Sequence, residues 1–346
     1  MSDPGAAEPG QRSGSQPPAD QFGTAGVTVV VVTWQGAHLL PDCLDSLAAQ
    51  SVPCQVLVVD NASTDRTPQL LAERAAELRV LRLPSNTGFA GGVAAALPHV
   101  RTPFLALLNN DAAAEPDWLE RSLAALADRP DTAAITSRLL TWPVQGKPVL
   151  INNAGVQLVR GGYGADRGLH AENGPPFDVP AEVFGFSGGA AVLRTAAVRA
   201  VGGMPAEFFL YYEDTDLAWR LRLAGWRVWY EPTAVVHHRH GASTDLKSDV
   251  FAFHTERNRL LMLLRCAPAG MAIAQLARFV LTTFSLQARR LAGQRVPDAR
   301  VFSLVLRMRV FASVLRHCPG TIRSRRRITR SAIRSRQEVA RAWVAG

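Results

Sequence analysis

Three acidic residues, Glu213, Asp214 and Asp216, directly follow an apolar and aromatic run that begins at Phe208. Crowding and a partly apolar pocket can raise the pKa of one of two adjacent carboxylates, which makes it a usable general base. The alternative is structural. Acids at a helix start satisfy free N–H groups, and Asp216 lies one turn before Arg220, within reach of an ion pair. The segment alone leaves both interpretations open.

Polar and glycine-rich stretches follow the apolar runs of the N-terminal half. Asp60 can accept a hydrogen bond from a base N–H, Trp34 offers a ring nearby, and the turn at Gly88 lets backbone approach ribose or phosphate. Asp111 supplies a hard oxygen for Mg²⁺ or Mn²⁺, which needs only one or two carboxylates when phosphates complete its shell. Each stretch alone also fits a turn or a helix cap. Together, the stretches at 33–34, 60–65, 86–92 and 109–111 indicate a nucleoside-diphosphate site.

These stretches come after the strands of one predicted sheet. Apolar runs rich in β-branched residues predict strands at Val27–Thr33, Gln55–Asp60, 79–83 and Phe104–Leu108, with helical patterns at about 39–50 and 67–77. Such alternation implies right-handed crossovers and a mostly parallel α/β sheet, which binds ligands beyond the carboxyl ends of its strands. The chain has neither the GxxxxGKS/T of a P-loop nor a GxGxxG turn after its first strand, so those two classes are disfavoured.

The composition predicts one large core and an appendage. The chain has 346 residues, of which 47% are hydrophobic. Its four cysteines show no paired metal-ligand spacing, which is typical of a reducing cytosol. Residues 1–26 are rich in Pro, Gly, Ser and Ala without a basic stretch leading into an apolar core, so we expect a disordered leader and no signal peptide.

The positive charge belongs to the C-terminal part of the chain. From Phe251 onward there are 19 arginines and no lysine against three acids, so the preceding residues are net acidic. The runs at 271–286 and 301–315 mix apolar residues with single arginines, as interfacial helices do. We expect no spanning helix, because Arg265 and Arg278 interrupt the best candidate for about 18 apolar residues. The alternative is a helical cap with a solvated arginine face.

Taken together, these segments resemble inverting glycosyltransferases of family 2, which have the GT-A fold. The resemblance covers residues 27–264. It is carried, in order, by VVVVTWQG, VVDNASTD, NTGFAGG, LLNNDA, GFSGGAAVLR, YYEDTDLAWRLRLAGW, VVHHRHGAST and HTERNRLLMLLR. The spacing looks most like bacterial rhamnosyl- and galactofuranosyl-transferases that act on lipid-linked cell-wall glycans.

The resemblance implies a domain plan. A GT-A catalytic domain would span 27–250, with a nucleotide-binding half at 27–112 and an acceptor or catalytic half at 113–250. Residues 251–346 would form a helical, arginine-rich extension that associates with a membrane.

The resemblance also assigns roles to residues. Asp214 would be the general base, with Glu213 beside it. Asp111 would hold the metal with His238 or His237, of which only one can face the site on a strand. We expect His238, because it lies five residues before Ser243, the spacing that the family shows. The donor-binding residues would be Thr33, Trp34, Asp60, Asn61, Ser63, Asn86, Gly88, Asn109, Asn110 and Asp111, with Asn109 in place of the first acid of the family's DxD motif. The acceptor-binding residues would be Gly188, Gly189, Glu213 and Asp216.

The expected reaction is inverting transfer of a sugar from a nucleotide-diphosphate donor, first dTDP-rhamnose, to a lipid-linked or cell-envelope glycan. Donors based on UDP (galactofuranose, glucose or N-acetylhexosamines) are the alternative. A divalent metal, Mg²⁺ or Mn²⁺, and a peripheral position on the cytoplasmic face of the membrane are implied, without a nucleic-acid partner. Other interpretations left open are a sugar nucleotidyltransferase, a non-enzymatic binding protein with a basic tail, and an inactive transferase weakened by Asn109.

Overall fold

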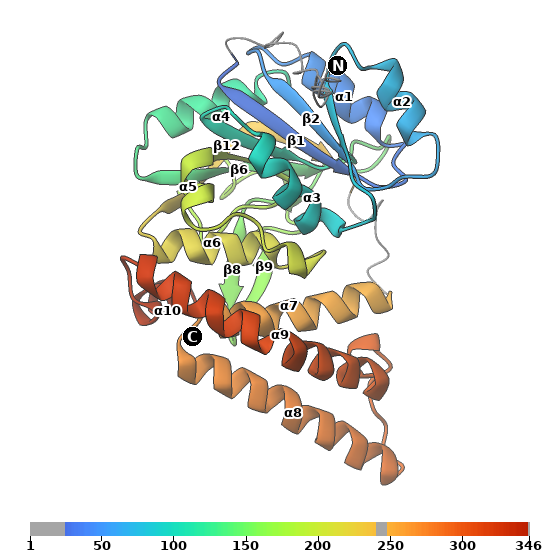
Figure 1. Cartoon of the computed structure of the whole chain (residues 1–346), viewed down its shortest axis with the longest axis vertical. Helices are drawn as coiled ribbons and strands as arrows, with labels where there is room; N and C mark the ends of the chain where they lie inside the picture. The colour runs from blue at the N-terminus through green and yellow to red at the C-terminus, as the bar shows by residue number, and fades with distance from the viewer. Residues whose placement is uncertain (1–24, 240–247, 345–346) are drawn as a thin grey trace, which may run out of the picture.

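The computed structural model describes residues 25–239 and 248–344. Figure 1 shows an α/β body in the upper part of the molecule and a layer of C-terminal helices below it. The leader expected at 1–26 lies outside the described residues except for its last two positions, and so does Ser243.

The body is organised around a sheet that has ten strands within the described residues. The strand order is β10-β12-β6-β11-β4-β1-β2-β3, with β5 paired to β12 and β7 to β6. The four N-terminal strands are β1 (Val27–Thr33), β2 (Gln55–Asp60), β3 (Arg79–Arg82) and β4 (Phe104–Leu108). They are mutually parallel and in register, so that Thr33 lies opposite Asp60 and Asp60 opposite Arg82. The predicted parallel sheet is confirmed, and the carboxyl ends of its strands meet at one edge.

The other half of the sheet is mixed. Strand β11 (Ala190–Arg194) is antiparallel to both β4 and β6 (Thr132–Thr141), while β12 (Arg227–His238) is parallel to β6. The short strands are β5 (Ala112–Ala114), β7 (Ile151–Asn153) and β10 (Ala181–Glu182). A separate two-stranded sheet joins β8 (Val156–Val159) and β9 (Tyr163–Asp166). The long β12 carries its last residue, His238, to the edge where the parallel strands end.

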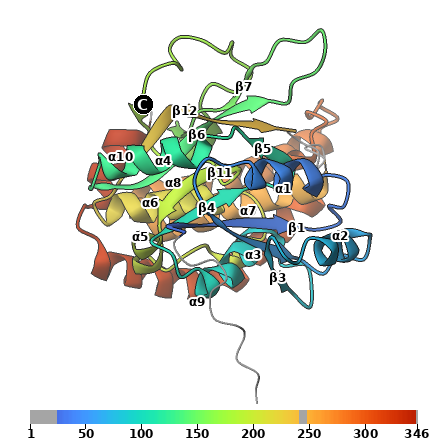
Figure 2. The same cartoon turned by 90° about the horizontal axis from the view of Figure 1, so that it is seen from above.

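Helices cover both faces of the sheet. The helices α1 (Leu40–Ala48) and α4 (Trp118–Ala127) pack on one face with Val29 and Val31 of β1, and α3 (Gly88–Ala96) packs on the other with Val30. Figure 2 shows α1 and α4 on one side of β1 and α3 on the other. The remaining body helices are α2 (Thr67–Glu73), α5 (Thr195–Ala200) and α6 (Glu213–Leu223). The β-branched run of β1 is therefore buried from both sides, as its composition predicts.

The C-terminal helices pack against the body. They are α7 (Asp249–Cys266), α8 (Ala269–Leu291), α9 (Leu304–Ser331) and α10 (Arg336–Trp343). The core cluster that includes Leu217 of α6 also contains Leu260 of α7, Val310 of α9 and Val339 of α10, so it continues across residue 250. The domain boundaries at 112 and 250 stay predictions, and a cut at 250 would divide one core.

The helix α8 is the outermost of the four (Figure 1). By length and composition it could cross a membrane, and only 17% of its apolar window is buried inside the protein. This differs from the expectation of no spanning helix. Arg265 belongs to the preceding helix α7, and Arg278, which does lie within α8, leaves the helix apolar enough by this measure. Ile273, Phe284 and Leu291 are 65%, 70% and 81% exposed. The alternative interpretation, a helical cap with a solvated arginine face, does not account for this exposed apolar face.

Candidate active site

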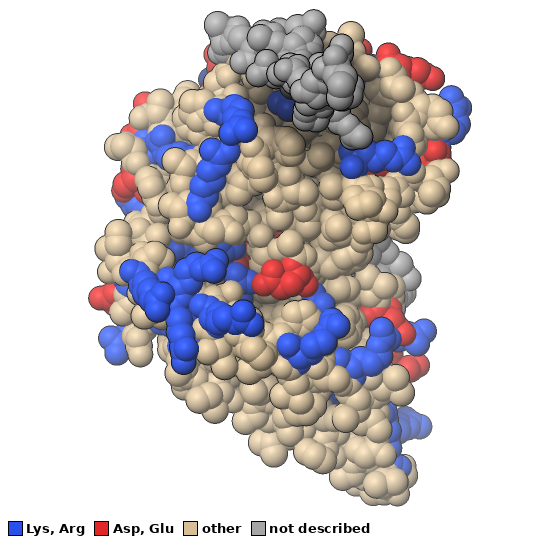
Figure 3. Space-filling view, viewed as in Figure 1, with Lys and Arg blue, Asp and Glu red and all other residues tan. Residues whose placement is uncertain are grey.

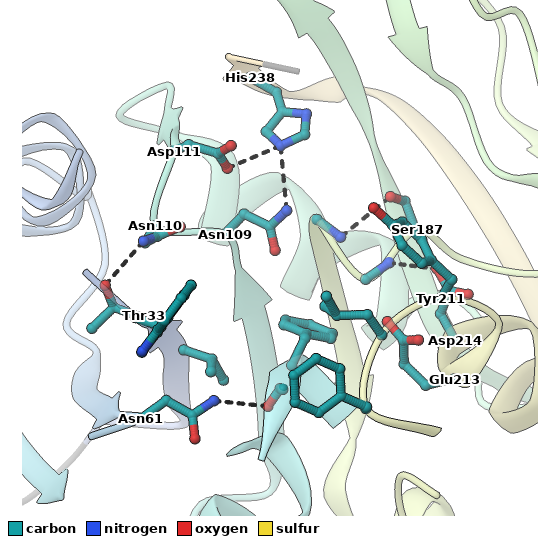
Figure 4. A pocket seen from close by; sticks show the side chains of 18 of the residues that line it. Thr33, Asn61, Asn109, Asn110, Asp111, Ser187, Tyr211, Glu213, Asp214 and His238 are labelled. Atoms are coloured by element: carbon teal, nitrogen blue, oxygen red, sulfur yellow. Dashed lines mark hydrogen bonds and ion pairs between the residues drawn. The ribbon is translucent and has the colours of Figure 1, made fainter. Parts of the chain in front are cut away.

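One cleft of about 630 Å³ lies at the carboxyl ends of β1 and β4 and reaches the start of α6. Most of the predicted site residues line it: Thr33, Trp34, Asn61, Asn86, Gly88, Asn109, Asn110, Asp111, Gly188, Gly189, Glu213, Asp214 and His238. Figure 4 shows Asp111 and His238 on one side of this cleft, and Glu213 and Asp214 on another. The structure does not bring Asp60, Ser63, Asp216 and His237 into the lining.

At the donor end of the cleft, two amide side chains link the strand ends and the glycine turn to one another. The Nδ2 of Asn110 donates to Oγ1 of Thr33 over 2.9 Å, which ties the end of β4 to the end of β1. The Nδ2 of Asn61 donates to the carbonyl of Gly88 over 3.0 Å, while its Oδ1 accepts from the backbone N–H of Thr87. These bonds fix the backbone around the space in which a nucleotide would lie.

Asp60 and Ser63 lie behind this lining. Oδ1 of Asp60 accepts from the backbone N–H of Ser63, three residues on, over 2.9 Å, a local bond of the kind that the alternative interpretation as a turn requires. Arg82 lies 3.5 Å from Oδ2 of the same carboxylate, and Ser63 Oγ accepts from the backbone N–H of Gln35. The contact between Asp60 and a base stays a prediction.

Gly88 contacts the segment that leads to the acids. Its φ is +71°, and a Cβ there would lie 2.2 Å from the carbonyl oxygen of Phe209. The same oxygen accepts from the backbone N–H of Ala90 over 3.0 Å. We expected the glycine turn to admit ribose or phosphate. The structure shows in addition that it packs directly against the residues preceding Glu213.

His238 lies beside Asp111 and Asn109. Its Nδ1 is 2.8 Å from Oδ1 of Asn152, an acceptor, so we place the proton of the neutral ring on Nδ1. The lone pair of Nε2 then faces the Nδ2 of Asn109 at 3.3 Å and Oδ1 of Asp111 at 3.0 Å. An imidazole nitrogen and a carboxylate oxygen that face each other suit a shared divalent cation. His237 points elsewhere, to Oε1 of Glu115 at 3.0 Å.

Within the described residues no group of three or more His, Cys, Asp or Glu forms a metal site. Asp111 and His238 would supply two ligands, which is what a metal completed by phosphates requires. Asn109, which stands in place of an acid, directs its Nδ2 toward Nε2 of His238 at 3.3 Å.

Asp214 is held at the other end of the cleft. Its Oδ2 accepts from the backbone N–H of Gly188 over 3.0 Å, and its Oδ1 accepts from the backbone N–H and hydroxyl of Thr215. Burial raises the pKa of Asp214, these hydrogen bonds oppose that change, and the like charge of Asp166 adds to it. A half-buried carboxylate with a raised pKa and an open cleft before it is a suitable general base.

Glu213 lies beside Asp214, and their like charges interact. The charge of Asp166 of β9 also acts on Asp214. The expectation that Glu213 keeps Asp214 basic, or contacts the acceptor, stays a prediction. Burial, and then the charge of Asp214, raise the pKa of Glu213 well above its ordinary range. The raised pKa favours the neutral form of Glu213 beside Asp214. Among the described residues no hydrogen-bond partner meets its Oε2, although Glu213 lines the cleft.

Asp216 lies inside the protein. Oδ1 accepts from Nε of Arg220 over 2.7 Å, the ion pair one turn apart that the spacing suggested, and Nε of Arg265 lies 3.3 Å from Oδ2. The side chain has no exposed surface, so the structure places Asp216 away from the cleft in which an acceptor would bind.

Sequence reasoning missed several residues of the lining. Asn152 and Asn153 of β7, Asp166 of β9 and Tyr211 all reach the cleft. The paired asparagines within an apolar run were a usable signal, since buried amides need partners. Asp166 lies in a stretch that reads as a variable loop, and nothing local marks it.

Comparisons with known proteins agree with this geometry. Residues 28–155 match the family model described as Glycosyl transferase family 2. The chain is 32% identical over 263 residues to N-acetylglucosaminyl-diphospho-decaprenol L-rhamnosyltransferase of Mycobacterium tuberculosis. This alignment covers 65% of this chain and 80% of that protein. It is 29% identical over 215 residues to the pre-mycofactocin glycosyltransferase of the same organism, covering 62% of this chain and 43% of that protein.

Two solved structures have a similar fold. GalNAc-T7 with UDP, GalNAc and Mn²⁺ matches with a TM-score of 0.52 and 12% identity, over 70% of this chain and 50% of that one. Mannosyltransferase PcManGT from Pyrobaculum calidifontis, in complex with GDP-Man and Mn²⁺, matches with a TM-score of 0.50 and 18% identity, over 85% and 87% of the chains. The fold is GT-A-like, and the chain is a member of glycosyltransferase family 2, an enzyme that transfers a sugar from a nucleotide sugar.

Proposed function

We propose that this enzyme transfers L-rhamnose from dTDP-rhamnose to a polyprenyl-diphosphate-linked glycan, with inversion at the anomeric carbon. The observation that carries the proposal is a single cleft that contains both the Asp111–His238 pair and the half-buried base Asp214. The identity of 32% to a decaprenol-linked rhamnosyltransferase supports the sugar and the acceptor class. Donors based on UDP are the alternative.

The proposed reaction is one displacement. The acceptor hydroxyl oxygen forms a bond to the anomeric carbon as the bond from that carbon to the diphosphate oxygen breaks, and nucleoside diphosphate leaves. The hydroxyl proton passes to the carboxylate of Asp214, which the N–H of Gly188 holds in place. One carboxylate on the attacking face leads to inversion, by the geometry that separates inverting from retaining glycosidases.

Asp111 and His238 are the residues that would hold Mg²⁺ or Mn²⁺, with Asn152 fixing the ring that presents Nε2. A bound divalent ion supplies charge neutralisation for the leaving diphosphate. The Mn²⁺ bound with UDP and GalNAc in one fold relative, and with GDP-Man in the other, supports this choice. Donor contacts would come from Thr33, Trp34, Asp60, Asn61, Ser63, Asn86, Gly88, Asn109 and Asn110, and acceptor contacts from Gly188, Gly189 and Glu213.

The C-terminal helices would bring the enzyme to its lipid-linked acceptor at the cytoplasmic face of the membrane. The exposed apolar side chains of α8, among them Leu281 and Phe284, would enter the interface, as amphipathic helices do. Figure 3 shows basic side chains, all of them arginines in this part of the chain, gathered over α9 and α10. Exposed arginines there are Arg323, Arg326, Arg327, Arg330, Arg334 and Arg341. They would meet anionic headgroups or the diphosphate of the acceptor.

A panel of nucleotide sugars, assayed with Mn²⁺ or Mg²⁺, vesicles and a polyprenyl-diphosphate-linked acceptor, tests the proposal. We expect turnover of dTDP-rhamnose, and loss of about 10²–10⁴-fold in kcat for Asp214→Asn. Asp131→Asn, which changes an exposed carboxylate beside Arg227, is the control and should retain full activity. Preference for a UDP-sugar would overturn the donor assignment, and an active Asp214→Asn would overturn the base.

A further inference from the structure

The backbone that precedes Glu213 has an unusual conformation. Phe209 has φ and ψ of 67° and −68°, and Tyr211 and Tyr212 have φ of 69° and 68°. The N–H of Leu210 donates to the carbonyl of Phe208 over 2.8 Å, which closes a γ-turn of the strained form centred on Phe209. Aromatic L-residues disfavour positive φ, so contacts from elsewhere must hold this conformation.

One side chain of α7 provides most of those contacts. The Nδ2 of Asn258 lies 2.9, 2.7 and 2.8 Å from the carbonyl oxygens of Phe208, Leu210 and Tyr211. The carbonyl of Phe209 accepts from Ala90 instead. Asn258 is completely buried, so these carbonyls have an amide in place of water.

The amide of Asn258 is itself oriented. Its Oδ1 accepts from Nε of Arg257 over 2.8 Å, which turns the two N–H groups of Nδ2 toward the segment. The Nη2 of Arg257 donates to the carbonyls of Glu207 and Phe208, each over 2.8 Å. Arg257 is also buried. Arg257 and Asn258 therefore donate hydrogen bonds along the whole turn that leads to Glu213 and Asp214.

We propose that Asn258, oriented by Arg257, is a positioning residue for the base. It holds the γ-turn and the two left-handed tyrosines, so that α6 begins at Glu213 and Asp214 reaches the N–H of Gly188. The inference rests on the proposed role of Asp214. Asp111 follows β4 and His238 ends β12, so the metal-binding end of the donor site does not depend on Asn258.

The test is Asn258→Asp, which keeps the shape of the side chain, removes both N–H donors and turns carboxylate oxygens toward carbonyl oxygens. We expect kcat to fall about 100-fold, as displacement of a reacting group by about 1 Å does. The Kd of the donor nucleotide should change less than about threefold, since Asp111 and His238, which would hold its metal, lie on other elements. The acid limb of kcat should move to higher pH, because Asp214 loses a hydrogen bond that lowers its pKa.

A matched control is Arg194→Gln. Arg194 of β11 donates to the carbonyls of Leu126 of α4 and Thr132 of β6 over 2.7 and 2.8 Å, and none of the three is a proposed site residue. We expect this variant to have a lower Tm and an unchanged kcat. If Asn258→Asp lowers Tm like the control and retains kcat and the pH profile, the positioning role is overturned.

Two further measurements complete the test. Should Asn258→Asp fail to fold, Arg257→Lys keeps the charge but removes the Nε–H that orients the amide. It should lower kcat at an unchanged donor Kd, and an unchanged kcat overturns the inference. Asp214→Asn is assayed in parallel. An active Asp214→Asn contradicts the proposed base itself, whereas an inactive one beside a fully active Asn258→Asp contradicts only the positioning role.

Discussion

Oδ1 of Asn152 lies 2.8 Å from Nδ1 of His238, and this hydrogen bond turns Nε2 of the ring toward Asp111. The bond selects one tautomer, and that tautomer presents a lone pair where a carboxylate oxygen already lies. Metal-binding histidines generally donate their other ring N–H to such an acceptor, which fixes the tautomer and the orientation of the ring.

Asn152→Leu is expected to weaken metal binding. The change removes the acceptor that orients His238, so the metal concentration for half-maximal activity should rise about 10–100-fold, with kcat restored at saturating metal. Titration of activity with Mn²⁺ measures this. His237→Gln, whose ring contacts Glu115 outside the cleft, should leave the titration unchanged. A response to His237→Gln and none to Asn152→Leu would contradict the assignment of His238.

Asp166→Asn is expected to move the acid limb of the pH profile to lower pH. The pKa of Asp214 is raised first by burial and also by the charge of Asp166, so removal of that charge lowers it. A base must be deprotonated to act, and activity then appears at lower pH. The profile of kcat/KM against pH measures the shift, and a limb that moves upward would contradict the Coulombic role of Asp166.

Glu213→Gln is expected to stabilise the protein at neutral pH. The folded pKa of Glu213 is raised by burial and by Asp214, so stability declines as pH rises above the unfolded pKa. Glutamine does not ionise and escapes that decline. Tm should therefore be higher than in wild type at about pH 7–8 and equal near pH 4, where both forms are neutral. Equal Tm values across this range would mean that Glu213 is not held neutral.

Gly88→Ala is expected to be more destabilising than Gly146→Ala. Both glycines have positive φ, of +71° and +76°, which costs an L-residue about 1 kcal/mol. Only at Gly88 does a Cβ also meet the carbonyl of Phe209, at 2.2 Å. Urea denaturation of both variants isolates the clash. We expect Gly88→Ala to lose activity as well, because the displaced carbonyl belongs to the γ-turn before Glu213.

Substitution of the exposed face of α8 is expected to release the enzyme from membranes. Leu281→Glu with Phe284→Glu places two charges on that face, and co-sedimentation with vesicles that contain anionic lipid should fall about tenfold or more. Val80→Glu, at an exposed apolar residue of β3, is the control. Point changes are preferable to deletion from residue 251, because Leu260 and Leu263 of α7 belong to the core. Unchanged sedimentation would contradict the membrane role of α8.

Local signals in the chain determined much of this protein. The β-branched run of β1 predicted a strand buried on both faces, and the polar residues after four strands predicted one ligand-binding edge, because parallel strands end on the same side. The acids at the start of α6 were recognisable from their spacing. What the spacing left open was their division of roles, since Asp216 forms buried ion pairs while Asp214 faces the cleft.

Tertiary structure alone decided which residues complete the site. His238 meets Asp111 across 127 positions of sequence, and Asn258 reaches Leu210 across 48. Asp166 influences Asp214 from a separate two-stranded sheet. Periodicity and propensity describe neighbours along the chain, whereas these contacts depend on strand order and on how α7 packs beneath the body. The sequence therefore determined the family, the sheet and the candidate base, and only the packed fold decided which side chains orient the metal ligand, raise the pKa of the base and hold its turn.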